Sequence, residues 1–513
     1  AKARSYAQGS QSVSKYKDLL DVEGDTSYLN LDWTPVNIIP KFLDLIVNDL
    51  SNQEYEVLAN ATDPIAETKR EQDKNRMFAQ MLVKPGLEEL SKVTGYDVTQ
   101  KGYIPRTQEE LDIHMALSYK QATEVSMEKG IKFVMDLSNY DGIKKAVIRD
   151  LVVCGIGACK TYIDPNVGVK IKRVEPSNLI TSYTNHEDYS DIQHAGEVYT
   201  ITIGELKRLA GDQLNEEDFN KIAGEYSGKN NNDTISPNYE SYVNQHQNEH
   251  EYDKFRVTVL DAEFFSVNEL KYEKKKNIYG GYTVRKKDHS YKKPKISKLE
   301  RELIKTSVKV VYSGMWIVGT DFVLNYGLAK NMMRKKSNLT ETKLSYVVYA
   351  PGTHKMINKS MVERMIPFAD QIQLAHLKLQ QIIAKARPKG AAFELGALEN
   401  VSKGDGGTFT PMELQEIYDQ TGNMQKLIMI YGHNLQMIRD VTGVNEAKEG
   451  AKPPSEALVG VQKLQILASN NATRNINDGY LSLTKRIAEC VCMRLQDIIK
   501  NKVKFRSYSN ALG

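Results

Sequence analysis

Residues 361–386 read MVERMIPFADQIQLAHLKLQQIIAKA. Their apolar side chains recur at alternating intervals of four and three residues for almost four heptads, which predicts a long amphipathic helix. Such a helix spans roughly 40 Å. Pro367 inside the pattern predicts a kink or a late helix start. The apolar stripe contains Met361, Met365, Phe368, Ile372, Ala375, Leu379, Ile382 and Ala386, and the opposite, weakly charged face contains Gln371, Gln373, Lys378, Gln380, Gln381 and Lys385.

Two more long helices are expected downstream. Arg387-Pro-Lys-Gly390 ends the first helix, and a strand-like piece (AAFELGALENV) and a glycine-rich turn follow. The second helix opens at Pro411, with Thr410 as N-cap and Glu413 completing a capping box, and runs to about Ile438. A loop rich in glycine and proline then precedes a last helix, which runs from Ser455 to about Lys500.

The chain before residue 360 mixes helices with strands. The first forty residues are polar, and we expect an extended arm that packs on a neighbour or partner. Thr107 and Glu110 form a predicted capping box at the start of the third helix. We expect helices at 41–52, 66–93, 107–136, 138–153 and 203–211, and strands at 156–174, 255–267, 307–319 and 344–350. The predicted fold class is therefore α+β.

Composition excludes several classes of protein. The 513 residues are 41% hydrophobic and 26% charged, with a mean hydropathy of −0.48, which excludes wholesale disorder and a collagen-like fibre. No apolar run approaches the ~20 residues of a membrane helix, and the N-terminus has no apolar signal region. The four cysteines, Cys154, Cys159, Cys490 and Cys492, are expected to be buried free thiols in a reducing compartment, so synthesis is expected in the cytoplasm.

Positive charge gathers in one segment. Residues 271–298 carry a net charge of +9, whereas the rest of the chain carries −5. This basic arm either contacts phosphates or an acidic partner, or it is a solvated hairpin tip whose lysines prevent edge aggregation. A polar insertion, residues 227–252, precedes it. The candidate contact residues of the basic arm are Lys274, Lys275, Lys276, Arg285, Lys286, Lys287, Lys292 and Lys293.

No motif of the chain predicts catalysis. His246, Glu249 and His250 match the letters H-x-x-E-H of inverted zinc peptidases, but their flanks lack the apolar face of a rigid helix. The segment GIGACKT at 155–161 lacks the spacing of a phosphate-binding loop. We therefore expect no catalytic residues, no metal and no cofactor. The alternative is a soluble zinc- or nucleic-acid-processing enzyme that uses the HQNEH segment and the basic arm.

The order of these segments resembles that of the portal (head-to-tail connector) proteins of tailed bacteriophages. The most specific stretch is IRDVTGVNEAKEGAKPPSEALVGVQKL, residues 438–464, which is similar to the tunnel loop of that family and the kinked helix after it. Residues 169–209 and 308–334 are similar to wing segments of short-tailed phage portals. The resemblance is strongest to portals of crAss-like phages and covers most of residues 100–500, departing at the polar insertion and the basic arm.

The resemblance implies a domain plan and a function. The implied function is a dodecameric ring at one capsid vertex that conducts double-stranded DNA during packaging and ejection. Its implied partners are the terminase motor, the major capsid protein and the tail adaptor or head-completion proteins, with no membrane. The implied segments are an arm (1–40), a wing (41–359), a first stem helix (360–387), a clip (388–410), a second stem helix (411–437), a tunnel-loop region (438–455) and a long helix leading to a crown (456–513).

The same resemblance places two sets of residues. Asn445, Glu446, Lys448, Glu449 and Lys452 would face DNA from the tunnel loop. In the clip, Phe393, Leu395 and Leu398 would form a strand between subunits, with Lys389 and Lys403 beside them.

Overall fold

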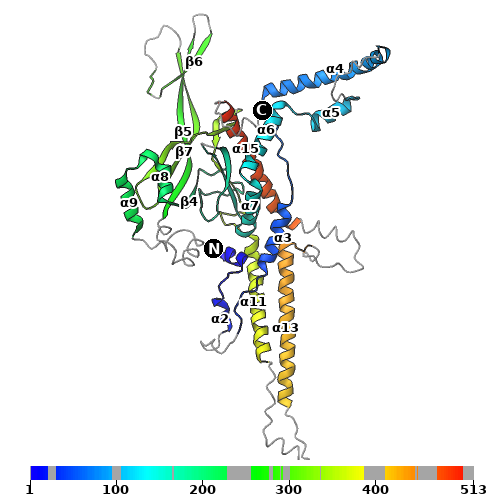
Figure 1. Ribbon diagram of the computed structural model, residues 1–513, viewed down its shortest axis with the longest axis vertical. Helices are drawn as coiled ribbons and strands as arrows, with labels where there is room; N and C mark the ends of the chain where they lie inside the picture. Colours follow the sequence, from blue (N-terminus) through cyan, green and yellow to red (C-terminus); the bar gives the residue numbers. More distant parts are fainter. Residues whose placement is uncertain are drawn as a thin grey trace, which may run out of the picture.

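A central body of helices and strands carries three projections (Figure 1). One is a pair of long helices, one a twisted β-ribbon and one a pair of helices on the opposite flank. The mixture of helices and antiparallel sheets confirms the expected α+β class. The computed structural model describes residues 2–20, 31–94, 105–164, 167–227, 256–276, 281–288, 290–292, 301–335, 337–385, 411–444, 448 and 471–500.

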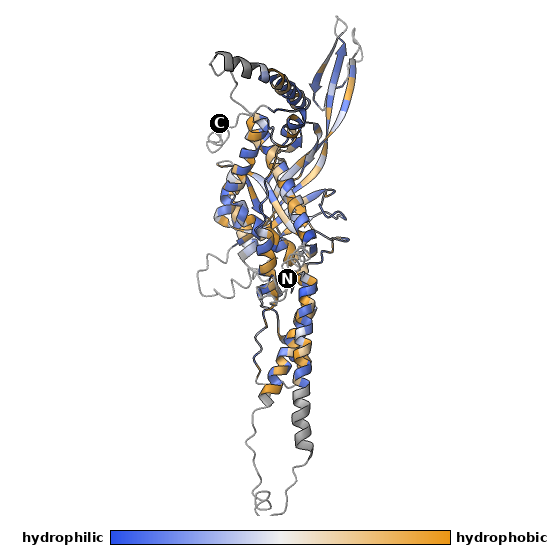
Figure 2. Ribbon diagram, turned by 90° about the vertical axis from the view of Figure 1, so that its right-hand side faces the viewer, coloured by the Kyte–Doolittle hydropathy of each residue, from blue (hydrophilic) through white to orange (hydrophobic). Residues whose placement is uncertain are grey.

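The main core lies where helices from distant parts of the chain pack on a small sheet. This sheet has the order β11-β1-β2 and is antiparallel throughout, and its β1–β2 hairpin confirms the two strands expected around residues 164–168. Figure 2 shows hydrophobic positions concentrated in this central body. The elements are α3 (Ile39–Ser51), α6 (Ala122–Leu137), α7 (Tyr140–Cys154), β1 (Gly157–Asp164), β2 (Gly168–Arg173), β11 (Tyr346–Tyr349), α11 (Met361–Lys385) and α15 (Arg474–Lys500).

Local sequence explains where several of these helices begin. Pro40 lies in the first turn of α3, where its missing N–H costs nothing, and the buried residues of α3 recur at helical spacing. Thr107 caps its helix as expected, because its Oγ1 accepts from the N–H of Glu110 at 3.2 Å, but the Glu110 carboxylate accepts from the N–H of Arg106 at 2.7 Å, so the reciprocal half of the capping box is shifted by one residue. The helix it starts, α5 (Gln108–Leu117), ends early, and Gln121 with Glu124 starts α6 by a capping box. The single helix expected over 107–136 is therefore two helices.

A second antiparallel sheet forms the flank away from this core. Its order is β3-β4-β5-β7-β8, with β6 paired to the far end of β5. Two short helices, α8 and α9, pack over one face. Its elements are β3 (Leu179–Thr181), β4 (His194–Thr202), α8 (Ile203–Ala210), a 3-10 turn (Gly211–Gln213), α9 (Glu216–Ser227), β5 (Arg256–Lys276), β6 (Tyr282–Lys287), β7 (Arg301–Ile317) and β8 (Val323–Leu328), followed by the hairpin β9 (Met333–Lys335) and β10 (Asn338–Lys343).

The strands β5 and β7 are much longer than expected. They stay paired from Val259–Ile317 out to Lys275–Arg301, so they extend into the basic arm. We call their outer part together with β6 the blade, which comprises residues 266–276, 282–287 and 301–310. The blade projects from the body beyond the reach of α8 and α9 (Figure 1).

The N-terminal residues form helices that dock on their own chain. Residues 2–20 fold into α1 (Lys2–Gln8) and α2 (Ser14–Leu20), and Tyr6 and Tyr16 are almost fully buried. The extended arm expected over 1–40 is therefore wrong for these residues, because their widely spaced apolar side chains reach a core that no local pattern reveals.

The two long helices α11 and α13 (Pro411–Thr442) descend side by side from the body (Figure 1). Ser360 Oγ caps α11 by accepting from the N–H of Glu363 at 3.0 Å, and the helix passes through Pro367 without a late start. On the opposite flank, α4 (Pro64–Thr94) and α5 project together.

Arg494 joins the last helix to the first sheet. Its side chain is 4% exposed, and its guanidinium donates to Thr161 O at 2.9 Å, Asn331 Oδ1 at 2.9 Å and Ser345 Oγ at 2.7 Å. All of these acceptors are uncharged groups of the sheet and of the connection before β9. A buried cation is tolerated here because each of its nitrogens donates a hydrogen bond.

We predict that Arg494→Met lowers the free energy of unfolding by about 3 kcal/mol, because it leaves several buried acceptors without a donor while keeping the volume. Urea unfolding followed by circular dichroism measures the change. Lys485→Met, on an exposed position of the same helix, serves as the control. Equal stability of the two variants would contradict the prediction.

Candidate functional site

An acidic side chain on α11 holds the N-terminal helices against the long helix pair. Asp370 Oδ1 accepts from the hydroxyl groups of Tyr6 at 2.6 Å and Tyr16 at 2.7 Å, and its Oδ2 lies 2.6 Å from Lys15 Nζ. Lys15 also donates to the Tyr6 hydroxyl. One carboxylate therefore fixes both N-terminal helices on the flank of α11. We call these four side chains the clasp.

The charges of the clasp stabilise one another. Burial alone would raise the pKa of Asp370, but hydrogen bonds from Lys15, Tyr6 and Tyr16 outweigh it, so the pKa lies below its ordinary value. Burial and the bond to Asp370 together raise the pKa of Tyr16. Because the folded-state pKa of Asp370 is lowered, its contribution to stability is present above the ordinary Asp pKa and is lost only as the pH falls through the lower value.

The polar face expected on this helix is only partly open. Gln373 is 1% exposed, and its Oε1 accepts from the N–H of Val36 at 2.6 Å. Gln371 and Lys378 do remain exposed. Placing Gln373 on an open face was wrong, because the segment that leads into α3 runs along this side of α11.

The outer part of the helix pair leaves apolar side chains uncovered. Ile383 on α11 is 60% exposed, and Ile428, Met429 and Ile430 on α13 are 54%, 73% and 43% exposed. Because these three exposed apolar residues of α13 are consecutive, more than one side of the helix is left uncovered by the part of the chain that the structure describes. Figure 2 shows hydrophobic positions along both helices of this projection.

One residue of the expected tunnel loop is placed, and it is paired. Lys448 Nζ lies 2.8 Å from Asp49 Oδ2 at the end of α3. Together with Thr442 and Val444, these residues border a cavity of about 180 Å³. This ion pair reduces the net positive charge that Lys448 offers to a passing polyanion, and its position facing DNA stays a prediction. Asn445, Glu446, Glu449 and Lys452 lie outside the described residues.

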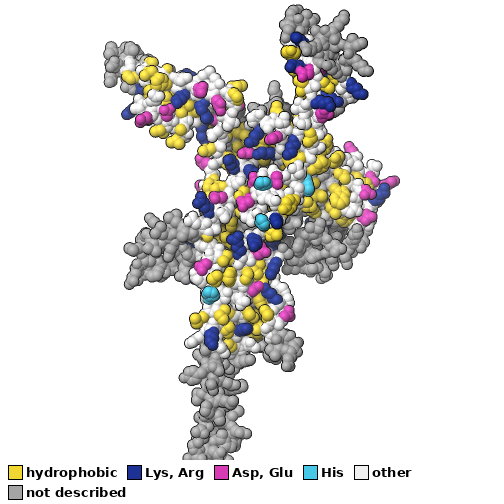
Figure 3. Space-filling model, turned by 180° about the vertical axis from the view of Figure 1, so that it is seen from behind, with side chains coloured by type: hydrophobic (Ala, Val, Ile, Leu, Met, Phe, Trp, Pro, Cys, Tyr) yellow, Lys and Arg dark blue, Asp and Glu magenta, His cyan; other side chains and the backbone are white. Residues whose placement is uncertain are grey.

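The basic arm forms the blade and the turn beside it. Figure 3 shows Lys and Arg side chains gathered on this projection. Several cations already have carboxylate partners, since Lys274 lies 3.7 Å from Glu302 and Lys287 lies 3.2 Å from the buried Glu273. Arg285, Lys286 and Lys292 are exposed, Lys275 and Lys276 are half-buried, and Lys293 lies outside the described residues.

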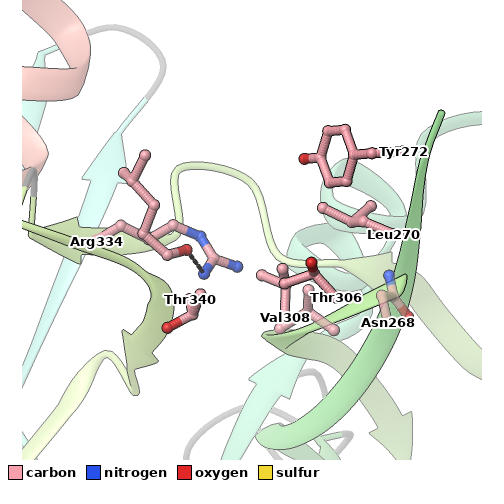
Figure 4. Close-up of a pocket in the computed structure, with 9 residues that line it drawn as sticks. Asn268, Leu270, Tyr272, Thr306, Val308, Arg334 and Thr340 are labelled. Atoms are coloured by element: carbon pink, nitrogen blue, oxygen red, sulfur yellow. Dashed lines mark hydrogen bonds between the residues drawn. The ribbon is translucent and has the colours of Figure 1, made fainter. Parts of the chain in front are cut away.

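A cleft opens where the blade leaves the body, between β5, β7 and the β9–β10 hairpin (Figure 4). Its volume is about 380 Å³, and its walls are mainly apolar, with Leu270, Val308 and Leu339 among the lining residues. Arg334 points into this space from β9. The sequence carried no signal for this cleft, because the two strands and the hairpin that form it are brought together only by sheet pairing.

The remaining candidates can be placed only in part. The clip residues Lys389, Phe393, Leu395, Leu398 and Lys403, and the HQNEH histidines, lie outside the described residues. Within the described part of the chain, no group of three His, Cys, Asp or Glu side chains is arranged to hold a metal ion. None of the helices described there combines the length and the apolar character that a membrane span needs.

The cysteines are free thiols, as expected. Cys159 and Cys490 are buried, and Cys154 and Cys492 are half-buried. Burial raises the pKa of Cys159 to about 12, which keeps it protonated and unreactive at neutral pH.

We predict that Asp370→Asn releases α1 and α2, because the neutral amide loses the ion pair with Lys15 and weakens both tyrosine bonds. Amide hydrogen exchange over residues 2–20 should accelerate by about tenfold at neutral pH. In the unmodified protein, the same acceleration should appear only at pH below the ordinary Asp pKa. Glu363→Gln, on an exposed position of the same helix, is the control, and unchanged exchange in Asp370→Asn would refute the clasp.

Comparison with known proteins identifies the family. A family model described as "Phage P22-like portal protein" matches residues 120–508, which includes the first sheet, the second sheet and the long helices. No curated protein matches the chain. The matched range covers well over half of the 513 residues, and the chain belongs to the phage P22-like portal protein family.

Proposed function

We propose that this chain forms a dodecameric portal ring at one vertex of a phage capsid. The ring conducts double-stranded DNA inward during packaging and outward during ejection. Family membership supports this function, and the observation that carries it is the uncovered apolar surface of α11 and α13. A closed ring needs two different surfaces of the same chain to meet, and long projecting helices with apolar flanks supply such surfaces.

The segments of the chain then take distinct roles. Residues 41–359 form the wing, α11 and α13 the two stem helices, and 388–410 the clip between them. Residues 438–455 form the tunnel-loop region, and the helix that follows leads to a crown. Within the family, we infer a kinship with the portals of crAss-like phages, from the stretch 438–464.

The clip docks the terminase motor first and the tail adaptors later. Phe393, Leu395 and Leu398 are the larger apolar residues of a strand-like stretch that would pair between subunits, which buries side chains and satisfies backbone groups. Lys389 and Lys403 flank this stretch and face the docked partners. The major capsid protein surrounds the wing.

The tunnel must let duplex DNA pass without holding it. Many Lys or Arg contacts to phosphates would hold the DNA, because each one adds a favourable, salt-dependent attraction. In the loop, Glu446 and Glu449 offset the two basic residues Lys448 and Lys452, and Asn445 is uncharged. Asp49 also pairs with Lys448, which leaves no excess of positive charge.

We predict that the purified protein has a native mass of 696 kDa, which is twelve copies of the 58.0 kDa chain. Met429→Asp should shift the population towards smaller species, because it places a charge on an apolar contact surface. Native mass spectrometry at moderate salt measures both. Ile357→Asp, exposed on a loop of the body, is the control. If Met429→Asp still formed unaltered rings, the helix pair would not be the contact surface between subunits.

We also predict that replacing both Glu446 and Glu449 by Lys slows DNA translocation. The double replacement raises the charge of each subunit by four units, which increases its attraction for phosphate. The measurement is the packaging rate in a reconstituted motor at low and high salt, and the slowing should weaken with salt. Glu216→Lys with Glu217→Lys, at the exposed start of α9, changes the total charge equally and controls for it. Identical rates for the two double variants would contradict a DNA-facing loop.

A further inference from the structure

The cleft beside the blade contains an arginine side chain that donates mainly to backbone carbonyl groups. The guanidinium of Arg334 donates to the carbonyl oxygens of Lys309 at 2.6 Å and Leu339 at 2.7 Å. Its longer contacts are to the carbonyl of Glu341 at 3.4 Å and to the sulfur of Met332 at 3.8 Å. No carboxylate within the described residues pairs with it. Burial lowers the pKa of Arg334, so an incoming carboxylate would relieve a cost that the carbonyl groups only partly offset.

The apolar walls of the cleft continue along one face of the blade. Strand alternation puts Leu270 and Tyr272 on the same side of β5, and the register places Lys286 on one side of Tyr272 and Ile304 on the other. We call this side the cleft face. Further out, Val284 and Tyr282 on the same face of β6 are 57% and 58% exposed.

Lysines border these apolar side chains, together with one carboxylate, Glu302, which lies opposite Lys274 and pairs with it at 3.7 Å. Lys274 and Lys276 share the cleft face, and Lys274 Nζ lies 4.5 Å from the centroid of the Tyr282 ring. Lys286 stands exposed beside Tyr272. An apolar centre with a charged rim is the usual anatomy of a protein–protein contact. A nucleic acid backbone would use the lysines but would gain nothing from Leu339, Val284 and Ile304.

We propose that the cleft and the cleft face bind an extended, acidic segment of a partner protein that also carries apolar side chains. Its apolar residues pack on Leu270, Val308 and Leu339, and one carboxylate reaches Arg334. Its other carboxylates meet the lysines of the blade. The site belongs to a single subunit, so it goes beyond the DNA conduit and does not depend on ring formation.

Two neighbouring residues of β6 give a matched test. Lys286 lies on the cleft face opposite Tyr272, whereas Arg285 lies on the other face opposite Glu273. Both side chains are exposed. Binding of a labelled random Glu–Tyr copolymer to the full chain is measured by fluorescence anisotropy, with poly-Glu and duplex DNA as comparison probes. Lys286→Glu should weaken copolymer binding about fivefold, and Arg285→Glu should leave it nearly unchanged.

The apolar half of the site has its own test. Leu339 is 64% exposed, so Leu339→Asp should fold normally yet weaken copolymer binding about tenfold, through lost apolar contact and repulsion. Val323→Asp, exposed on β8 and away from the cleft, is the control. The copolymer should also bind more tightly than poly-Glu.

Three results would overturn the proposal. Equal losses in Lys286→Glu and Arg285→Glu would indicate unspecific attraction by the whole blade. Tighter binding of duplex DNA than of the copolymer would assign the blade to nucleic acid instead. Absence of copolymer binding would leave the cleft without this role. None of these results tests ring formation, so the proposed portal function is tested separately by the native mass.

Discussion

The length of α11 is the constraint on which much of this structure depends. This helix of 25 residues starts in the body, where Val362, Met365 and Ile372 are fully buried, and extends beyond it (Figure 1). The apolar side chains in the remaining turns of α11 must therefore pack against other segments. The second long helix covers one side, and the N-terminal helices, held by Asp370, cover another. The apolar surface that stays exposed at the outer end of the helix pair is the one that we assign to contact with the neighbouring subunit.

The charged side chains of Arg494 and Asp370 stabilise different parts of the structure. Arg494 is satisfied entirely by uncharged acceptors, so it connects α15 to the first sheet without a counterion. The clasp instead couples one carboxylate to a lysine and two hydroxyl groups, which makes docking of the N-terminus sensitive to acid. Arg494 therefore stabilises the core at any ordinary pH, whereas the clasp holds a peripheral segment.

The blade shows how a charged segment can carry an ordered surface. A net positive charge over 271–298 is consistent with both a solvated tip and a contact arm. Pairing in three strands separates its side chains onto two faces. On one face Glu273 is buried and paired with Lys287, and on the other apolar residues are ringed by lysines and lead to Arg334. This asymmetry between the faces carries the argument for a protein partner.

Several elements with local signals could be predicted from the amino-acid sequence. The heptad spacing at 361–386, the N-cap at Thr107 and the hairpin of β1 and β2 all have counterparts in the structure, because each depends on residues within a few turns of one another. Order of segments alone also indicated the portal family. The sites, in contrast, form only when distant segments pack together. Tyr6 meets Asp370 across 364 residues, Lys448 meets Asp49 across 399, and Arg334 reaches a cleft built from three separate segments. No local pattern encodes such pairs, because the packing of distant elements brings their side chains together.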